Sequence, residues 1–224
     1  MNFKNMEATE VSQLLIKQLN NLYFINDSEG QSILSVTERV FSRLEYCFNN
    51  ISNKYYCSHE GAVFDGLHTC QYTMFLYETA HTLYKENSSN RSLCDRIYGI
   101  SKIISSADLF YEIDLPHIYF CEHPQGSVLG RAAYNNYFVF MQGCTVGNNK
   151  GRYPKFGEHV YMMSGSKVLG NCMIGDKVVI SANTYIKDQD IPSGTIVFGS
   201  SPDLTIKSLS DNKFKEISIN YFNG

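Results

Sequence analysis

Residues 156–187, FGEHVYMMSGSKVLGNCMIGDKVVISANTYIK, carry a large apolar side chain at every sixth position without a break. Four residues after most of these apolar positions stands a small or β-branched residue. Neither the 3.6-residue period of a helix nor the two-residue period of an ordinary strand gives this spacing, so the stretch predicts a structural repeat. The apolar positions are Phe156, Met162, Val168, Ile174, Ile180 and Ile186, and the small or β-branched positions are Val160, Ser166, Cys172, Val178 and Thr184.

A period of six predicts a three-sided prism of short parallel strands. Each strand turns one large apolar side chain inward, three strands complete one turn, and successive turns hydrogen-bond to one another as parallel sheets. The smaller residue takes the later inward position, where the prism is narrow. An irregular β-sandwich with strands six residues apart is the alternative, but six consecutive matches and the recurring glycines favour the prism.

The spacing also extends upstream, where it is interrupted once. Between Val146 and Phe156, ten residues occupy the place of six. The excess lies in residues 147–155 (GNNKGRYPK), whose glycines, asparagines and proline are typical of a loop. We therefore expect one loop to leave the prism, and loops on rigid scaffolds commonly bind ligands. The upstream positions form two runs: Leu115, Cys121 and Ser127, then Tyr134, Phe140 and Val146.

The first half of the chain shows helical spacing instead. Apolar residues recur three and four positions apart between Val11 and Leu22 and again between Ile33 and Phe48. Two further helices are predicted, over 63–85 and 91–105, with a polar turn between them. The predicted fold class is α+β, and its parts are an α-helical domain at 1–107, the β domain with its extruded loop at 108–207, and a C-terminal tail at 208–224.

The composition excludes several classes of protein. With 43% hydrophobic and 18% charged residues and a formal net charge of −3, the 224-residue chain favours neither disorder nor nucleic-acid binding. No stretch approaches the roughly 18–20 apolar residues of a membrane span, and the first ten residues lack a signal-peptide pattern, so a cytoplasmic protein is expected. Seven cysteines without a CxxC pair argue against disulfides and a thiolate zinc site.

Five segments resemble a known family in their order and spacing. They are similar to the hexapeptide-repeat acyltransferases, which form a left-handed parallel β-helix, and within them to the serine acetyltransferase-like group. The resemblance covers roughly residues 67–207 and implies an O-acetyltransferase that uses acetyl-CoA as co-substrate and needs no metal. The segments are 123–130 (HPQGSVLG), 142–147 (QGCTVG), 152–155 (RYPK), 164–171 (SGSKVLGN), and 174–202 from Ile-Gly-Asp to Phe-Gly-Ser-Ser-Pro.

The resemblance implies that His123 is the catalytic base. A histidine at this place in the family takes the proton of the acceptor hydroxyl, which then attacks the thioester. Imidazole suits this role because its pKa near 6.5 leaves it largely neutral at cytoplasmic pH. The family also places a carboxylate behind the base. The family spacing of fifteen residues gives Asp108, whereas the local sequence at 111–116 favours Asp114, and both alternatives stay open.

The same resemblance implies binding residues. Glu122 stands where the family often has an aspartate near the acceptor. Arg152 matches an anchor for an acceptor carboxylate, and Gly147 matches a position whose N–H faces the developing oxyanion. Lys207 would supply a cation for the nucleotide phosphates. Small residues that let the pantetheine arm of acetyl-CoA approach the backbone are Ser164, Gly165, Ser181, Ala182, Ser200 and Ser201.

Departures from the family bear on the acceptor. Serine-specific members carry Arg-His-Pro in the loop, whereas this chain has Tyr153 in the middle position, so Tyr153 is expected at a different acceptor. Pro202 is not followed by the usual cation, and the chain ends in Asn-Gly rather than the isoleucine that docks into a cysteine-synthesis partner. The main hypothesis is therefore O-acetylation of a small hydroxyl acceptor, a sugar or surface-polysaccharide precursor, and the alternative is L-serine O-acetylation for cysteine synthesis.

Other classes remain as alternatives. A non-catalytic trimeric scaffold would account for the weak phosphate motif. The hexapeptide-repeat carbonic anhydrases need three zinc-binding histidines, but only His123 and His159 fit, because the third position is Ser164. The flat sides of a prism favour side-by-side association, so we expect a homotrimer, with the helical domain as the surface through which trimers would pair.

Overall fold

The computed structural model describes residues 1–223, which divide into two compact units. The first unit contains residues 1–49 and 54–112, and the second contains residues 50–53 and the chain from 113 onward. Gly224, the last residue of the predicted tail, lies outside the described residues. All seven cysteines are free thiols. Within residues 1–223, no helix combines the length and the apolar character needed to cross a membrane.

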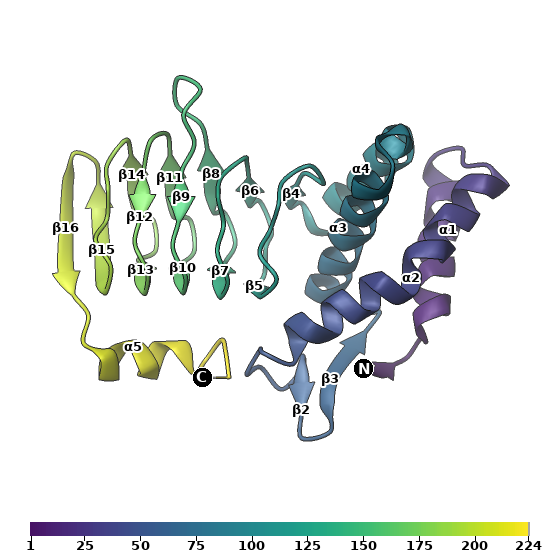
Figure 1. The fold of residues 1–224 in the computed structure, drawn as a ribbon, viewed down its shortest axis with the longest axis horizontal. Helices are drawn as coiled ribbons and strands as arrows, with labels where there is room; N and C mark the ends of the chain where they lie inside the picture. Colours follow the sequence, from purple (N-terminus) through teal and green to yellow (C-terminus); the bar gives the residue numbers. More distant parts are fainter. Residues whose placement is uncertain (224) are drawn as a thin grey trace. The chain divides into compact units, whose positions relative to one another are not determined.

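The first unit is mainly helical (Figure 1). A capping box starts its second helix: the Asn26 side chain accepts from the Glu29 N–H, and the Glu29 carboxylate accepts from the Asn26 N–H. Ser106 caps the last helix of the unit in the left-handed conformation. The helices are α1 (Ala8–Leu22), α2 (Asp27–Phe48), α3 (Thr69–Glu86) and α4 (Arg91–Ser105), with the 3₁₀ turn η1 (Ser88–Asn90) before α4.

The predicted helix at 63–85 is wrong at its start. Residues Gly61–Asp65 form strand β3, which pairs in parallel with β1 (Asn2–Lys4) and antiparallel with β2 (Cys57–Ser58). The helix α3 begins only at Thr69. The backbone groups of 61–65 find partners in a segment about sixty residues earlier in the chain, and local apolar spacing cannot reveal such a contact.

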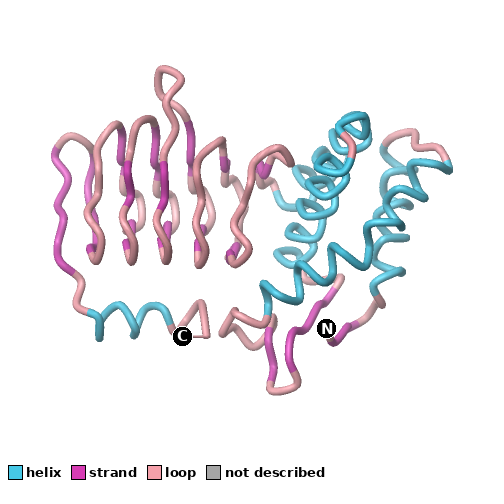
Figure 2. The backbone as a smooth tube through the Cα atoms, in the orientation of Figure 1, coloured by secondary structure: helices cyan, strands magenta, loops and turns pink. Residues whose placement is uncertain are grey.

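The second unit is a left-handed parallel β-helix of about five turns, as the period of six predicts (Figures 1 and 2). Each turn runs through faces A, B and C. Face A contains β5 (Tyr119–Cys121), β7 (Phe138–Phe140), β10 (Val160–Met162), β13 (Val178–Ile180) and the first half of β15 (Thr195–Ser200). Face B contains β6 (Val128–Leu129), β8 (Thr145–Gly147), β11 (Lys167–Leu169) and β14 (Tyr185–Lys187). Face C contains β9 (Lys155–Phe156) and β12 (Met173–Ile174).

The strand register explains the spacing of the sequence. Val168 pairs with Val146 below it and with Ile186 above it, at separations of 22 and 18 residues. The four extra residues of the longer turn form the extruded loop that Figure 1 shows between β8 and β9. All six apolar positions of 156–187 are at most 2% exposed, which confirms them as the core of the solenoid.

Columns of residues with positive φ form the three corners. At the A–B corner, glycines at 126, 143 and 165 and then Asn183 have φ between 60° and 72°. At the B–C corner, Gly170 and Asp188 have φ of 83° and 49°, and at the C–A corner Tyr137, His159, Lys177 and Gly194 have φ between 53° and 66°. Each corner therefore repeats one turn geometry from one level to the next, which glycine and asparagine adopt most easily.

The chain after β15 closes the solenoid and returns along it. Strand β16 (Asp203–Ser208) pairs antiparallel with β15, and helix α5 (Asp211–Ser218) then lies along the C–A corner. Phe214 of α5 stacks on Tyr161 with ring centroids 5.4 Å apart and meets the His159 ring edge-on at 5.8 Å. An aromatic cluster therefore attaches the C-terminal segment to face A.

Candidate functional site

The candidate base, His123, lies at the A–B corner of the first turn. The segment His-Pro-Gln-Gly forms a tight turn in which the Gln125 N–H donates to the His123 carbonyl at 2.8 Å. His123 is exposed and has a φ of 48°, and the ring of Pro124 fixes the next φ. No side chain among residues 1–223 hydrogen-bonds to the imidazole of His123. The ring therefore stands on a rigid corner with its nitrogens open to a ligand.

The A–B corner brings most of the predicted coenzyme residues into one line with His123. The Gly143 N–H donates to Gln125 O, and the Gly165 N–H and Asn183 N–H continue the ladder to Gln142 O and Ser164 O, at 2.8–2.9 Å. Because parallel turns lie about 4.8 Å apart, the line extends roughly 19 Å from the first turn to the fifth. Its predicted members, in order from the His123 turn, are Ser164, Gly165, Ser181, Ala182 and Ser200.

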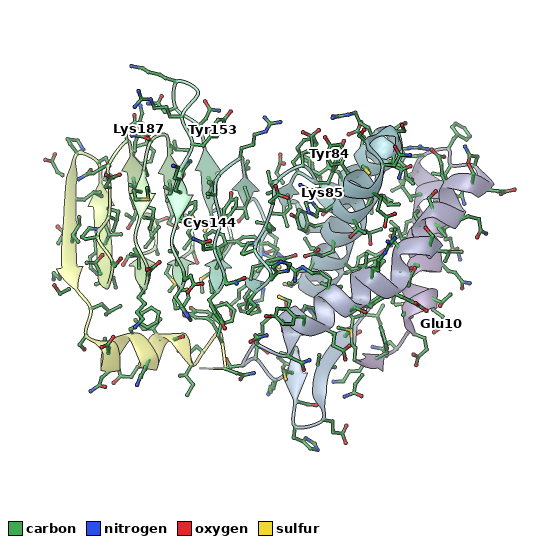
Figure 3. All side chains as sticks on the ribbon, viewed as in Figure 1. Glu10, Tyr84, Lys85, Cys144, Tyr153 and Lys187 are labelled. Carbon is green, nitrogen blue, oxygen red and sulfur yellow. The ribbon has the colours of Figure 1, made fainter. Side chains whose placement is uncertain are left out.

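The B–C corner carries the predicted acceptor residues on the extruded loop. Asn149 and Arg152 exchange two backbone hydrogen bonds of 3.0 Å, and the two residues between them, Lys150 and Gly151, have positive φ. This is a two-residue hairpin turn, which a Lys-Gly pair with positive φ at both positions allows. Arg152 is exposed and Tyr153 is 39% exposed at the base of the loop (Figure 3).

Gly147 belongs to the B–C corner and not to the corner of His123. It pairs with Leu169 in face B, and its carbonyl accepts from the Gly170 N–H at 2.9 Å. A Cβ at this glycine would lie 3.0 Å from Leu169 Cδ2. Within one chain, face B therefore separates His123 and the predicted coenzyme line from Gly147, Arg152 and Tyr153.

Two side chains of the first unit hydrogen-bond to the carboxylate of Asp108. Lys102 Nζ donates to Asp108 Oδ2 at 2.9 Å, and the Tyr98 hydroxyl donates to Oδ1. The hydrogen bond to Asp108 raises the pKa of Lys102, and burial together with the same carboxylate raises the pKa of Tyr98. Asp114 is exposed and belongs to the second unit. Both carboxylates stay predictions as partners of His123.

Glu122 directly precedes the base and lies at the end of face A. Its N–H donates to Phe140 O at 3.1 Å, and its side chain is half-buried. Burial, followed by the charge of Glu122, raises the pKa of Tyr221 to about 12. The carboxylate of Glu122 therefore lies near the C-terminal segment, where the sequence pattern gave no indication of a neighbour.

A pocket of about 360 Å³ lies beside Ser201, at the far end of the solenoid. The Ser201 hydroxyl accepts from the Lys187 N–H at 3.0 Å and donates to Gln189 Oε1 at 2.9 Å. Lys187 lines this pocket, and Figure 3 labels it; sequence reasoning missed it, although it directly follows Ile186 of the repeat. The predicted cation, Lys207, instead lies over the Phe198 ring, 5.9 Å from its centroid.

The two histidines of the zinc alternative lie at different corners. His159 is at the C–A corner, where its ring stacks on Tyr137 at 4.2 Å, and His123 is at the A–B corner. Burial lowers the pKa of His159. Across residues 1–223, no three histidine, cysteine, aspartate or glutamate side chains come together as a metal site would require.

No protein-family model matches this chain. The serine acetyltransferase of Staphylococcus epidermidis is 32% identical over 126 residues, which are 54% of this chain and 57% of that protein. The chain is serine acetyltransferase-like. It spans just over half the length of the first curated relatives that it matches.

Solved structures support the same resemblance at the level of the fold. A serine acetyltransferase in complex with CoA matches this serine acetyltransferase-like chain with a TM-score of 0.68 at 17% identity, covering 89% of this chain and 84% of that one. A serine acetyltransferase in complex with cysteine matches with a TM-score of 0.70 at 19% identity, covering 95% and 85%. The fold and the family resemblance expected from the five segments are thus confirmed.

Proposed function

We propose that this protein transfers the acetyl group of acetyl-CoA to the side-chain hydroxyl of L-serine. The observation that carries the proposal is the 32% identity over 126 residues to a curated serine acetyltransferase. Matching solved structures named as serine acetyltransferases, one of them with CoA, add support. L-serine, the alternative of the sequence analysis, therefore takes the place of the sugar acceptor in our proposal.

In the proposed reaction, His123 accepts the proton of the serine hydroxyl. The hydroxyl oxygen attacks the thioester carbonyl, the new C–O bond forms, and the C–S bond breaks. His123 then returns the proton to the departing thiolate, so that O-acetylserine and CoA with a free thiol are released. A general base of this kind contributes roughly 10²- to 10⁴-fold in rate. The exposed ring on a rigid corner supports this role.

The carboxylate behind His123 would fix its tautomer and stabilise the imidazolium. Asp108, whose carboxylate accepts from Lys102 and Tyr98, and Asp114 both stay candidates. Whichever of Asp108→Asn and Asp114→Asn lowers kcat for serine more identifies the partner of His123.

Acetyl-CoA would lie along the A–B corner, where small residues leave the backbone accessible. The pocket beside Ser201 lies at the B–C corner with Asp188, so it would take the phosphate end of acetyl-CoA bound on a neighbouring copy, with Lys187 as a cation in its lining. Lys207 stays the predicted cation for the nucleotide phosphates. Arg152 would bind the serine carboxylate, with Tyr153 and Glu122 beside the acceptor. The N–H of Gly147 would face the oxyanion, a contact worth about 3–4 kcal/mol when well placed.

These two sets of residues lie on opposite edges of face B, so one chain cannot complete the site. We therefore propose a homotrimer in which the A–B corner of one copy lies against the B–C corner of the next. Exposed apolar side chains on faces B and C, Val128 at 41% and Met173 at 52%, support such contacts. Pairing of trimers through the helical unit stays a proposal, supported by Phe24, which is 96% exposed.

The test is release of the CoA thiol from acetyl-CoA by the purified protein with L-serine, with L-alanine as a matched acceptor that lacks the hydroxyl, and with nucleotide sugars. Turnover with serine alone is expected. Turnover with a nucleotide sugar alone would instead support the sugar acceptor, which Tyr153 favours. No turnover with either would support the non-catalytic scaffold. Tyr153→His, which restores the family's loop residue, should lower the KM for serine.

A further inference from the structure

The side chain of Asp188 forms one of the contacts that attach the extruded loop to the solenoid. Asn149 Nδ2, at the base of the loop, donates to Asp188 Oδ2. The other carboxylate oxygen, Oδ1, accepts from the Asn171 N–H at 2.8 Å. Asp188 directly follows β14 and has a φ of 49° at the B–C corner. One side chain thus connects two corner segments of the solenoid with the first residue of the hairpin.

Arg152 is the hairpin partner of the residue that Asp188 contacts. Asn149 and Arg152 are the paired residues of the hairpin, with two backbone hydrogen bonds of 3.0 Å between them. Fixing the Asn149 side chain therefore fixes the strand that carries Arg152 and Tyr153. Residues 150–153 are exposed, and the loop is held again where it returns to the solenoid, by the Ala133 N–H donating to Pro154 O at 3.1 Å.

Two further observations indicate that the carboxylate has a defined place. A Cβ at Gly170 would lie 2.1 Å from Asp188 Oδ1, so the carboxylate occupies space that only a glycine leaves open. The N–H of Asn171 and then the amide of Asn149 lower the pKa of Asp188, so the group stays ionised at neutral pH. An ionised acceptor makes stronger hydrogen bonds than a neutral one.

We propose that Asp188 is a positioning residue that holds the loop through Asn149 and thereby sets where Arg152 and Tyr153 meet the acceptor. This inference rests on the proposed function, because it assigns the loop to acceptor binding. Asp188 itself touches no reacting atom in this scheme. It does line the pocket beside Ser201, so an effect on acetyl-CoA is the competing outcome.

The test exchanges the two side chains. Asp188→Asn keeps an oxygen that accepts from the Asn171 N–H. Its new amide N–H₂ then faces the amide N–H₂ of Asn149, so two donors meet and their hydrogen bond is lost. Asn149→Asp sets two carboxylates against each other. The double variant carries both changes and restores a donor and an acceptor, with the partners reversed. It is the matched control, because a purely local loss of folding would not be repaired by a second substitution.

Each single variant should raise the KM for serine roughly 3- to 10-fold, the range expected for loss of one charged hydrogen bond at an exposed site. The KM for acetyl-CoA should stay unchanged, and the double variant should return to within about twofold of the wild type. A rise confined to the KM for acetyl-CoA would overturn the inference and place the effect in the pocket beside Ser201. Equal KM values in all four proteins would also overturn it.

A second measurement does not depend on activity. Trypsin cleaves after Lys150 and Arg152, which are exposed on the loop. The single variants should be cut at this loop several-fold faster than the wild type, and the double variant should regain resistance. If the wild type shows no turnover with serine, the proposed function fails, and the cleavage rates alone decide whether Asp188 anchors the loop. Equal cleavage rates would overturn the anchor.

Discussion

The cores of the two units are built in different ways. In the helical unit, the ring of Phe64 on β3 meets aromatic rings from β1, α2 and α3, with centroids 5.0–6.3 Å away. Its neighbours therefore come from positions that are scattered along the sequence. In the solenoid, Ile180 pairs with Met162 on one side and Val197 on the other, each about one turn away. A periodic core is visible in a sequence, and an aromatic cluster assembled from distant elements is not.

The difference also concerns cooperativity. A solenoid is close to a one-dimensional stack, in which a defect affects mainly the neighbouring turns. A compact cluster joins several elements, so a defect there should loosen all of them. A substitution in the solenoid should therefore loosen only nearby turns, whereas one in the aromatic cluster should loosen the helical unit as a whole.

The largest effect expected is on catalysis, whose base the proposal places in the solenoid. His123→Ala should lower kcat for serine acetylation by roughly 10²- to 10⁴-fold, because the proton acceptor is lost. His59→Ala is the matched control, since His59 has a side chain that is 90% exposed and lies between β2 and β3 of the helical unit. Steady-state thiol release compares the two. Equal activity of the two variants would show that His123 is not the catalytic base.

The next effect tests the two cores. Phe64→Ala should cost about 3–5 kcal/mol and lower hydrogen-exchange protection in all the helices that its ring joins. Ile180→Ala should cost about 2–5 kcal/mol, with loss of protection confined to the turns above and below. Hydrogen exchange resolved along the chain measures both patterns. A local pattern for Phe64→Ala, or a global one for Ile180→Ala, would contradict the comparison.

Replacing a glycine with alanine should destabilise the solenoid and stabilise the helical unit. At Gly175, a Cβ would lie 2.5 Å from the Ser193 backbone nitrogen, so adjacent turns must move apart at a cost of about 1–3 kcal/mol. At Gly30 of α2, the nearest atoms lie at 3.8 Å, and better helix propensity should stabilise the fold by about 0.5–1 kcal/mol. Urea denaturation gives both values, and the same sign for both would contradict the prediction.

The smallest effect concerns pH and the attachment of α5. Burial lowers the pKa of His159 below its ordinary value of 6.5, with smaller opposing effects from Glu158 and Asp176 and a lowering effect from Lys177. When α5 is detached, His159 is less buried and binds a proton more readily than when α5 is attached. The contribution of His159 to docking is fully present above about pH 6.5 and falls as the pH drops below it. Hydrogen exchange of α5 should accelerate there, and His159→Phe, which keeps the ring, should remove this pH dependence.

The sequence predicted the solenoid well because its core repeats. Every apolar position from Phe156 to Ile186 is buried, and the interruption before Phe156 is the extruded loop. Helix 91–105 has the predicted bounds, whereas the predicted helix at 63 begins as a strand, because β1 supplies its partner from the other end of the unit. For the candidate site, the sequence placed His123 and the small residues in the same order in which the A–B corner stacks them.

By itself, the sequence determined the three-sided coil, its loop and the family that it resembles, because each of these repeats or runs through local segments. Only the tertiary structure decided which residues meet across turns: Asn149 and Asp188 are 39 residues apart, and His159 and Phe214 are further still. The tertiary structure also separated the predicted site into two edges of face B. Such contacts depend on the rotation of the chain from turn to turn and on polar side chains at corners, which carry no hydrophobic period and so leave no pattern in the sequence.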